Sequence, residues 1–199
     1  MGEEDHIVMA LPENRLSTEP ISASFLSPDN RVEDEEIDWE RGGVAINDAS
    51  QGLDVQDWRA EADGSSIRIF DEADVVRFTL ERPGVTAVSL AFDQNMRVTL
   101  AYVANKVAYL YWFDTNINDI RDDEYPDIIY PRLGTDDKRP SQNANSDVIF
   151  AYVRGGSLYY RQQRDRYTIE RLLAEDVRGI LRNIGLSTAN RFQFEFYGV

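Results

Sequence analysis

Neighbouring acidic residues give this sequence its first candidates for chemistry. The pairs Asp122-Asp123 and Asp136-Asp137 could supply a general acid and a general base, as two carboxyl groups do in glycoside hydrolysis. Adjacent residues on a loop rarely flank a scissile bond, and a chain with 36 acidic residues contains neighbours by chance. The single histidine, His6, lies in a proline-rich segment, so a Ser-His-Asp triad on a rigid frame is not expected. The sequence therefore predicts a protein that is not an enzyme, with no catalytic residue and no cofactor.

A second candidate is a calcium loop that begins at Asp114. Asp114, Asn116 and Asn118 place oxygen donors at alternate positions. An EF-hand needs glycine at its sixth position and glutamate at its twelfth, but Asp119 and Tyr125 stand there. A solvated turn is therefore preferred, with a looser calcium site as the alternative. The absence of cysteine excludes disulfides, iron–sulfur clusters and thiol catalysis.

Aromatic residues concentrate in two segments that also read as strands. If Tyr111, Trp112 and Tyr160 are exposed, they could stack on sugar rings, and the chain would be a carbohydrate-binding module for a host-surface glycan. If they are buried, they belong to the core or to a subunit contact, which is the commoner role. We keep glycan binding as the alternative function.

Charged segments predict a contact between copies of the chain. Arginine side chains pair well with carboxylates because the guanidinium donates several hydrogen bonds in one plane. Residues 33–40 hold six acidic residues in eight positions, and such a run usually stays solvated or meets a basic partner. The predicted subunit-interface residues are Arg161, Arg164, Arg166, Glu33, Asp34, Glu35, Glu36 and Trp39.

The charge of the chain limits its partners. The net charge of −15 and the pI of about 4.4 argue against nucleic acid and against an anionic membrane. Residues 1–100 contain 8 basic and 22 acidic residues, whereas the last 49 residues contain 8 arginines and 5 acidic residues. An acidic front and a basic back are complementary between copies, which favours a homo-oligomer, although ordinary surface scatter explains the same counts.

The elements that must position these residues are mainly strands. Pro12, Pro20 and Pro28 exclude a long helix, so residues 1–40 are predicted to form an extended N-terminal arm that ends in the acidic run. Residues 41–199 are predicted to form a β-rich domain. Within it, Asp63-Gly64 is a strong hairpin signal between two alternating segments.

A hairpin recurs at a spacing of fifty residues. The segments 98–103 and 107–113 return as 148–153 and 157–160, inside repeat units of about 86–114 and 136–166. Residues 98–103 are apolar on both faces, which indicates an interior strand. A fifty-residue repeat has the size of a four-stranded propeller blade. The predicted fold class is all-β, with antiparallel sheets in propeller-blade-like or sandwich-like packing of the two repeats.

Two segments are less clearly β. Residues 114–146 are rich in Asp, Asn and Pro and are predicted to form a long loop that carries function or a partner contact. The apolar residues of 169–184 fall at helical spacing, which leaves a short C-terminal helix as an alternative, although Gly179 interrupts it. The alternating segment 191–197 predicts a terminal strand.

Several strings resemble a group of tailed-bacteriophage virion proteins. They are residues 42–53, 89–97, 109–114, 136–139, 146–148 and 158–167. The resemblance covers most of the chain from about residue 40 and implies a β-rich module of the tail, collar or fibre-attachment region. It carries no catalytic residues. It implies a ring-like homo-oligomer, contacts with other virion proteins, and a location in the virion after synthesis in the bacterial cytoplasm. The acidic N-terminus lacks the pattern of a signal peptide, and no apolar run reaches the roughly 18 residues of a membrane helix.

Overall fold

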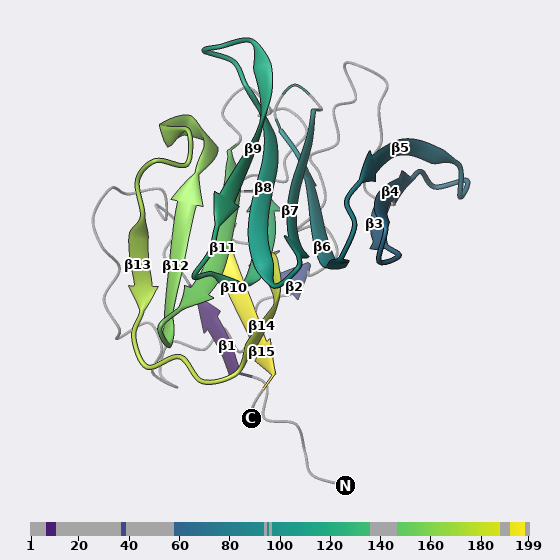
Figure 1. Ribbon diagram of the computed structural model, residues 1–199. Coiled ribbons are helices and arrows are strands. Elements are labelled where there is room, and N and C mark those ends of the chain that lie inside the picture. The colour runs from purple at the N-terminus through teal and green to yellow at the C-terminus, as the bar shows by residue number, and fades with distance from the viewer. Residues whose placement is uncertain are drawn as a thin grey trace, which may run out of the picture.

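The computed structural model describes residues 7–10, 37–38, 58–93, 95, 97–135, 147–187 and 192–197. Within these residues the chain forms strands in four antiparallel sheets and no α-helix, which confirms the predicted all-β class (Figure 1). Sheet I contains β3 (Arg59–Ala62), β4 (Ser66–Phe70) and β5 (Val76–Glu81). Sheet II contains β6 (Val85–Phe92), β7 (Val98–Ala104), β8 (Val107–Asp114) and β9 (Asp119–Tyr125).

Sheets III and IV complete the order. Sheet III contains β10 (Ile129–Thr135), β11 (Val148–Arg154), β12 (Ser157–Gln162) and β13 (Arg171–Ala174), and the short 3-10 turn η4 (Gln163–Asp165) follows β12. Sheet IV contains β1 (Ile7–Ala10), β2 (Ile37–Asp38), β14 (Ile180–Ser187) and β15 (Phe192–Tyr197), in the order β1-β15-β14-β2. Sheet IV therefore joins strands from both ends of the chain.

The sheets pack face to face in the order I, II, III, IV. Ile67 of sheet I shares a core cluster with Leu100 of sheet II, and Leu110 of sheet II shares the next cluster with Phe150 of sheet III. A third cluster joins sheet III to Phe194 of sheet IV. Sheets II and III are therefore covered on both faces, which agrees with the predicted propeller-blade-like or sandwich-like packing of the two repeats (Figure 1).

Strand β11 shows how the sequence produces this packing. Side chains alternate between the two faces of a strand. Phe150 and Tyr152 accordingly lie in the cluster between sheets II and III, whereas Ile149, Ala151 and Val153 lie in the cluster between sheets III and IV. Both faces must be apolar, so the segment reads as a continuous apolar run. Strand β7 follows the same rule, and the prediction that its segment is an interior strand is confirmed.

The fifty-residue repeat coincides with corresponding strands. Hairpin β7–β8 lies in sheet II and hairpin β11–β12 in sheet III, each as the two central strands of a four-stranded antiparallel sheet. Tyr102 faces Tyr109 across the first hairpin, and Tyr152 faces Tyr159 across the second. The hairpins expected from the sequence are therefore confirmed.

Two predictions about segments between and after the hairpins are wrong. The expected loop 114–146 contains β9 and β10, because β9 is an edge strand whose exposed acidic residues read as loop. The helical alternative for 169–184 is replaced by β13 and β14, since the neighbouring sheet offers strand pairing to apolar residues. The predicted terminal strand is β15. Of the expected arm 1–40, residues 7–10 and 37–38 pair with β15 and β14, and the rest lies outside the described residues.

Candidate functional site: the arginine-rich turn between two sheets

The arginine-rich segment singled out in the sequence forms a tight turn after β12. Arg166 donates its backbone N–H to Gln163 at 2.7 Å, and Tyr167 donates its N–H to Gln162 at 3.0 Å. Arg166 and Tyr167 adopt left-handed backbone conformations, with φ of 53° and 54°. From this compact turn, the side chains of Gln163, Arg164 and Arg166 reach residues at the ends of strands in sheets II and III.

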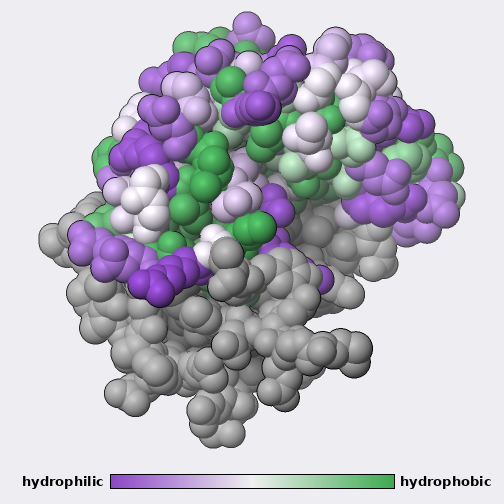
Figure 2. Space-filling view, turned by 60° about the horizontal axis from the view of Figure 1, so that its bottom comes forward, coloured by the Kyte–Doolittle hydropathy of each residue, from purple (hydrophilic) through white to green (hydrophobic). Residues whose placement is uncertain are grey.

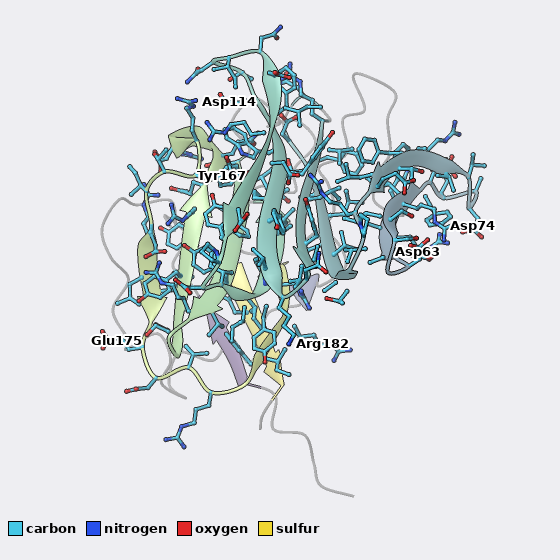
Figure 3. All side chains as sticks on the ribbon, viewed as in Figure 1. Asp63, Asp74, Asp114, Tyr167, Glu175 and Arg182 are labelled. Carbon is cyan, nitrogen blue, oxygen red and sulfur yellow. The ribbon has the colours of Figure 1, made fainter. Side chains whose placement is uncertain are left out.

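Three buried aspartates surround this turn. Asp93 follows β6, Asp114 ends β8, and Asp147 precedes β11, with exposed fractions of 2%, 0% and 4%. Buried carboxylates are costly unless they are paired and hydrogen-bonded, so their partners decide whether the site is stable. Figure 3 shows Asp114 and Tyr167 at the same end of the sheets.

Each aspartate receives a donor from the turn. Arg164 donates its backbone N–H and its Nε to Asp147 at 2.9 and 2.6 Å. Arg166 donates Nε and Nη2 to Oδ2 of Asp114 at 3.1 and 2.5 Å. The Gln163 amide donates to Asp93 at 3.3 Å.

The contacts to Asp93 and Asp114 cross from sheet III to sheet II, so the turn links the two sheets. Beneath it, the ring of Tyr167 is buried and lies edge-on to Trp112 of sheet II, with 5.0 Å between ring centroids. The turn therefore joins the two sheets through one ion pair, one amide hydrogen bond and an aromatic contact.

The carboxylates respond differently to this environment. The hydrogen bonds from Arg166 lower the pKa of Asp114, with a further contribution from the backbone N–H of Asn116, and together they outweigh burial. Burial raises the pKa of Asp147, even though Arg164 pulls it down. Burial also raises the pKa of the Tyr167 phenol, and the charges of Asp147 and Asp93 add to the effect.

A tyrosine–arginine–carboxylate network lies at each of two sheet interfaces. The Tyr102 hydroxyl accepts from Nε of Arg82 at 2.6 Å and donates to Asp122 at 2.8 Å. Fifty residues later, the Tyr152 hydroxyl accepts from Nε of Arg161 at 2.8 Å and donates to Glu170 at 2.5 Å.

Each of these tyrosines also stacks on the tyrosine opposite it in the hairpin. The ring centroids are 5.1 Å apart for Tyr102 and Tyr109, and 6.1 Å apart for Tyr152 and Tyr159. The paired tyrosines thus recur at the fifty-residue spacing, whereas their arginine and carboxylate partners come from positions that do not correspond in the two units. Sequence analysis did not identify either network, although the recurrence of the paired tyrosines at a spacing of fifty was a visible signal.

The predicted interface arginines all have partners within the chain. Arg161 contacts Tyr152, Glu170 and the backbone of Tyr167. Arg164 and Arg166 contact aspartates but keep 45% and 40% of their side chains exposed. The predicted acidic partners Glu33, Asp34, Glu35 and Glu36, and the predicted interface residue Trp39, lie outside the described residues. Pairing of arginine with carboxylate is thus seen inside one chain, and pairing between copies stays a prediction.

The aromatic residues named for glycan stacking are not presented as platforms. Trp112 and Tyr160 keep 2% and 3% of their surface exposed, and both belong to core clusters. Tyr111 is half-buried and packs against Phe78 of sheet I, with 5.8 Å between ring centroids. Burial between sheets explains why these residues are large and aromatic. It also leaves the rings of Trp112 and Tyr160 inaccessible to a sugar.

The acidic candidates for chemistry serve structural contacts. Asp122 and Asp123 alternate across β9, so Asp122 accepts from Tyr102 whereas Asp123 accepts from Nε1 of Trp112 at 2.9 Å. Their carboxylates therefore do not converge. Asp114, the first residue of the calcium alternative, accepts a hydrogen bond at Oδ2 from Arg166 and one at Oδ1 from the N–H of Asn116 at 3.0 Å. No cluster of three or more metal-ligating residues occurs in the described part of the chain, and Asp136-Asp137 lies outside it.

Comparisons of the chain with family models, with curated proteins and with solved structures gave no match. The described residues also contain no helix with the length and hydropathy of a membrane span.

Proposed function

We propose that the chain is a non-enzymatic structural component of a tailed bacteriophage virion, in the tail, collar or fibre-attachment region. The resemblance of residues 42–53, 89–97, 109–114, 136–139, 146–148 and 158–167 to virion proteins supports this proposal. The observation that carries it is that residues 158–167 contain the contacts between two neighbouring sheets. They lie in β12 and the arginine-rich turn, where the Gln163 amide and the Arg166 guanidinium join sheet III to aspartates of sheet II. Polar side chains that hold neighbouring sheets together suit a structural module.

The proposal includes assembly by contacts between copies in a ring-like homo-oligomer, together with contacts to other virion proteins. Arg164 and Arg166 present the exposed parts of their side chains beside the turn, where acidic residues of a neighbouring copy would find them. Rings need front-to-back contacts, and the acidic first half and basic last quarter of the chain supply complementary charge. Such contacts weaken at high salt because exposed charges are screened.

Labelling of phage particles tests the proposal. An antibody raised against the full chain is applied to purified tailed particles and imaged by electron microscopy. We expect label at the tail, the collar or the fibre attachment, in constant proportion to particles after density-gradient purification. Label absent from intact particles, with the chain recovered only from the unassembled fraction of the lysate, would contradict a virion role.

A further inference from the structure

Strand β5 has an edge without a neighbouring strand in the described part of the chain. Sheet I has three strands, whereas sheets II and III have four, and β5 is its outer strand. Figure 1 shows β5 at the edge of sheet I, away from the other sheets. Arg77, Thr79 and Glu81 are exposed along it, while Phe78 and Leu80 face the core. An open edge offers backbone N–H and C=O groups to another strand.

The hydrogen bonds of β5 to β4 show which groups point outwards. Arg82 donates its N–H to the carbonyl of Ser65 at 2.9 Å, so the backbone N–H of Arg82 points to the β4 side. Alternate residues of an antiparallel strand pair with opposite neighbours. The N–H and C=O groups of Thr79 and Glu81 therefore point away from β4, to the open edge.

A bulge adds Arg77 to this edge. Ile69 pairs with Phe78, but Phe70 pairs with Val76, so Arg77 is one residue more than β4 requires. The extra residue of a bulge stays outside the ladder. Its backbone groups are consequently available for a strand on the other side.

Two other outer strands, β9 and β13, are protected from such pairing. Strand β9 carries Asp119, Asp122, Asp123 and Glu124, whose like charges would oppose each other in a self-paired strand. Strand β13 has only four residues. Dense charge and short length protect these two edges, whereas the protection of β5 is limited to the bulge at Arg77.

We propose that β5 pairs with β5 of a second copy of this chain, antiparallel and around a two-fold axis at Thr79. In this register the outward groups of Thr79 face those of Thr79 in the second copy. Arg77 donates Nε to Asp71 of its own chain at 2.5 Å but keeps 54% of its side chain exposed, and in this register it faces Glu81 of the second copy, which places opposite charges across the contact. Phe78 faces Leu80 of the second copy on the inner face. A register centred on Glu81 would oppose two glutamates instead. The contact goes beyond the proposed function and does not depend on a place in a virion.

Sedimentation of the full chain with substitutions at Thr79 tests the pairing. A contact of one strand pair buries little surface, so we expect a reversible dimer with a dissociation constant on the order of micromolar. Thr79→Pro removes the outward N–H without touching the ladder to β4, and it should abolish the dimer while thermal unfolding changes little. Thr79→Val keeps the N–H and should sediment as the unsubstituted chain does.

Disulfide trapping gives a second readout that does not need the proline variant to fold. The chain has no cysteine, so Thr79→Cys introduces a single thiol. Residues facing each other in a hydrogen-bonded pair have Cα atoms about 5.5 Å apart, which a disulfide can span. Mild oxidation should link Thr79→Cys chains at least about ten times faster than Thr115→Cys chains, whose thiol lies in the exposed turn after β8.

Three results would overturn the pairing. The first is an unsubstituted chain that stays monomeric at about 100 µM. The second is a folded Thr79→Pro variant that still dimerises, and the third is equal linking of the two cysteine variants. Larger assemblies that persist in Thr79→Pro, without linking of Thr79→Cys, would place the contacts elsewhere. That outcome would reject β5 pairing and leave the proposed virion role standing.

Discussion

Replacing Asp114 by alanine should loosen the link between sheets II and III. The Asp114 side chain is 1% exposed, and it accepts two hydrogen bonds from Arg166 and one from Asn116. Removing one partner of a fully buried ion pair costs about 3–5 kcal/mol. Arg166 keeps 40% of its side chain exposed, so water can hydrate the guanidinium left behind. We therefore expect a smaller loss of about 1–3 kcal/mol in the free energy of unfolding.

Urea unfolding of a double-mutant cycle measures this link. The cycle combines Asp114→Ala with Arg166→Gln, and its coupling energy should be about 0.5–2 kcal/mol because the two side chains contact each other directly. In a chain of this length, 2 kcal/mol corresponds to a fall of about 4–8 °C in Tm. The exposed Asp127→Ala serves as the control and should stay within about 0.5 kcal/mol of the unsubstituted chain. A coupling energy of zero, or equal effects of Asp114→Ala and Asp127→Ala, would refute the reasoning.

Further predictions concern pH, a buried hydroxyl and a turn. Arg166 lowers the pKa of Asp114, so the stability that this carboxylate supplies is present above its unfolded pKa of about 3.9 and is lost as the pH falls through the folded pKa. The destabilisation by Asp114→Asn should accordingly shrink between about pH 7 and pH 3 in urea titrations. Tyr152→Phe should cost about 1 kcal/mol in the same assay, since it removes a buried hydroxyl that joins an arginine to a glutamate. Gly84→Ala should lower Tm more than Gly64→Ala: both glycines have positive φ, but only at Gly84 would the new Cβ meet Asn105.

Each of these has a contradicting outcome. If Asp114→Asn destabilised the chain by the same amount at every pH, the ionised carboxylate of Asp114 would not be the source of the stability that we assign to its contact with Arg166. A Tyr152→Phe chain as stable as the unsubstituted one would show that the hydroxyl network adds nothing to packing. Equal Tm values for the two glycine variants would show that Asn105 yields without cost.

The sequence predicted the centre of the fold better than its edges. Residues 98–103 and 148–153 lie in sheets that are covered on both faces, and a covered strand must be apolar throughout. A short apolar run of this kind, bounded by turn residues, indicates a strand that is covered on both faces. Strand β9 has an open edge, and five of its seven residues, 119–125, are charged, so it resembles a loop. The charges that protect an edge strand from unwanted pairing also make its sequence resemble that of a loop.

The C-terminal part was ambiguous for a different reason. Residues 169–184 satisfy a helical spacing of apolar residues, and the local sequence does not say which neighbour will be present. Pairing of β14 with β15 and β2, and of β13 with β12, decides in favour of strands. Tertiary pairing thus overrides a local pattern.

The chemistry of the site was predictable, but its partners were not. The types of residue in the segment 161–166 indicated pairing of arginine with carboxylates of a neighbouring copy, and that pairing stays a prediction, whereas the carboxylates seen here belong to the same chain. The partner of Arg166 lies 52 residues away at the end of β8, and that of Gln163 lies 70 residues away after β6. Only the stacking of sheet III on sheet II brings these groups together, and a single sequence does not indicate which distant residues become neighbours in the fold.

Hydrogen exchange tests most directly whether sheets II and III act as one unit joined by the arginine-rich turn. Amides of the central strands β7 and β11 should exchange with the same opening free energy in the unsubstituted chain, close to that of global unfolding. Arg166→Gln should lower both by the same amount. Separate opening free energies for the two strands, or a change confined to sheet III, would contradict the link.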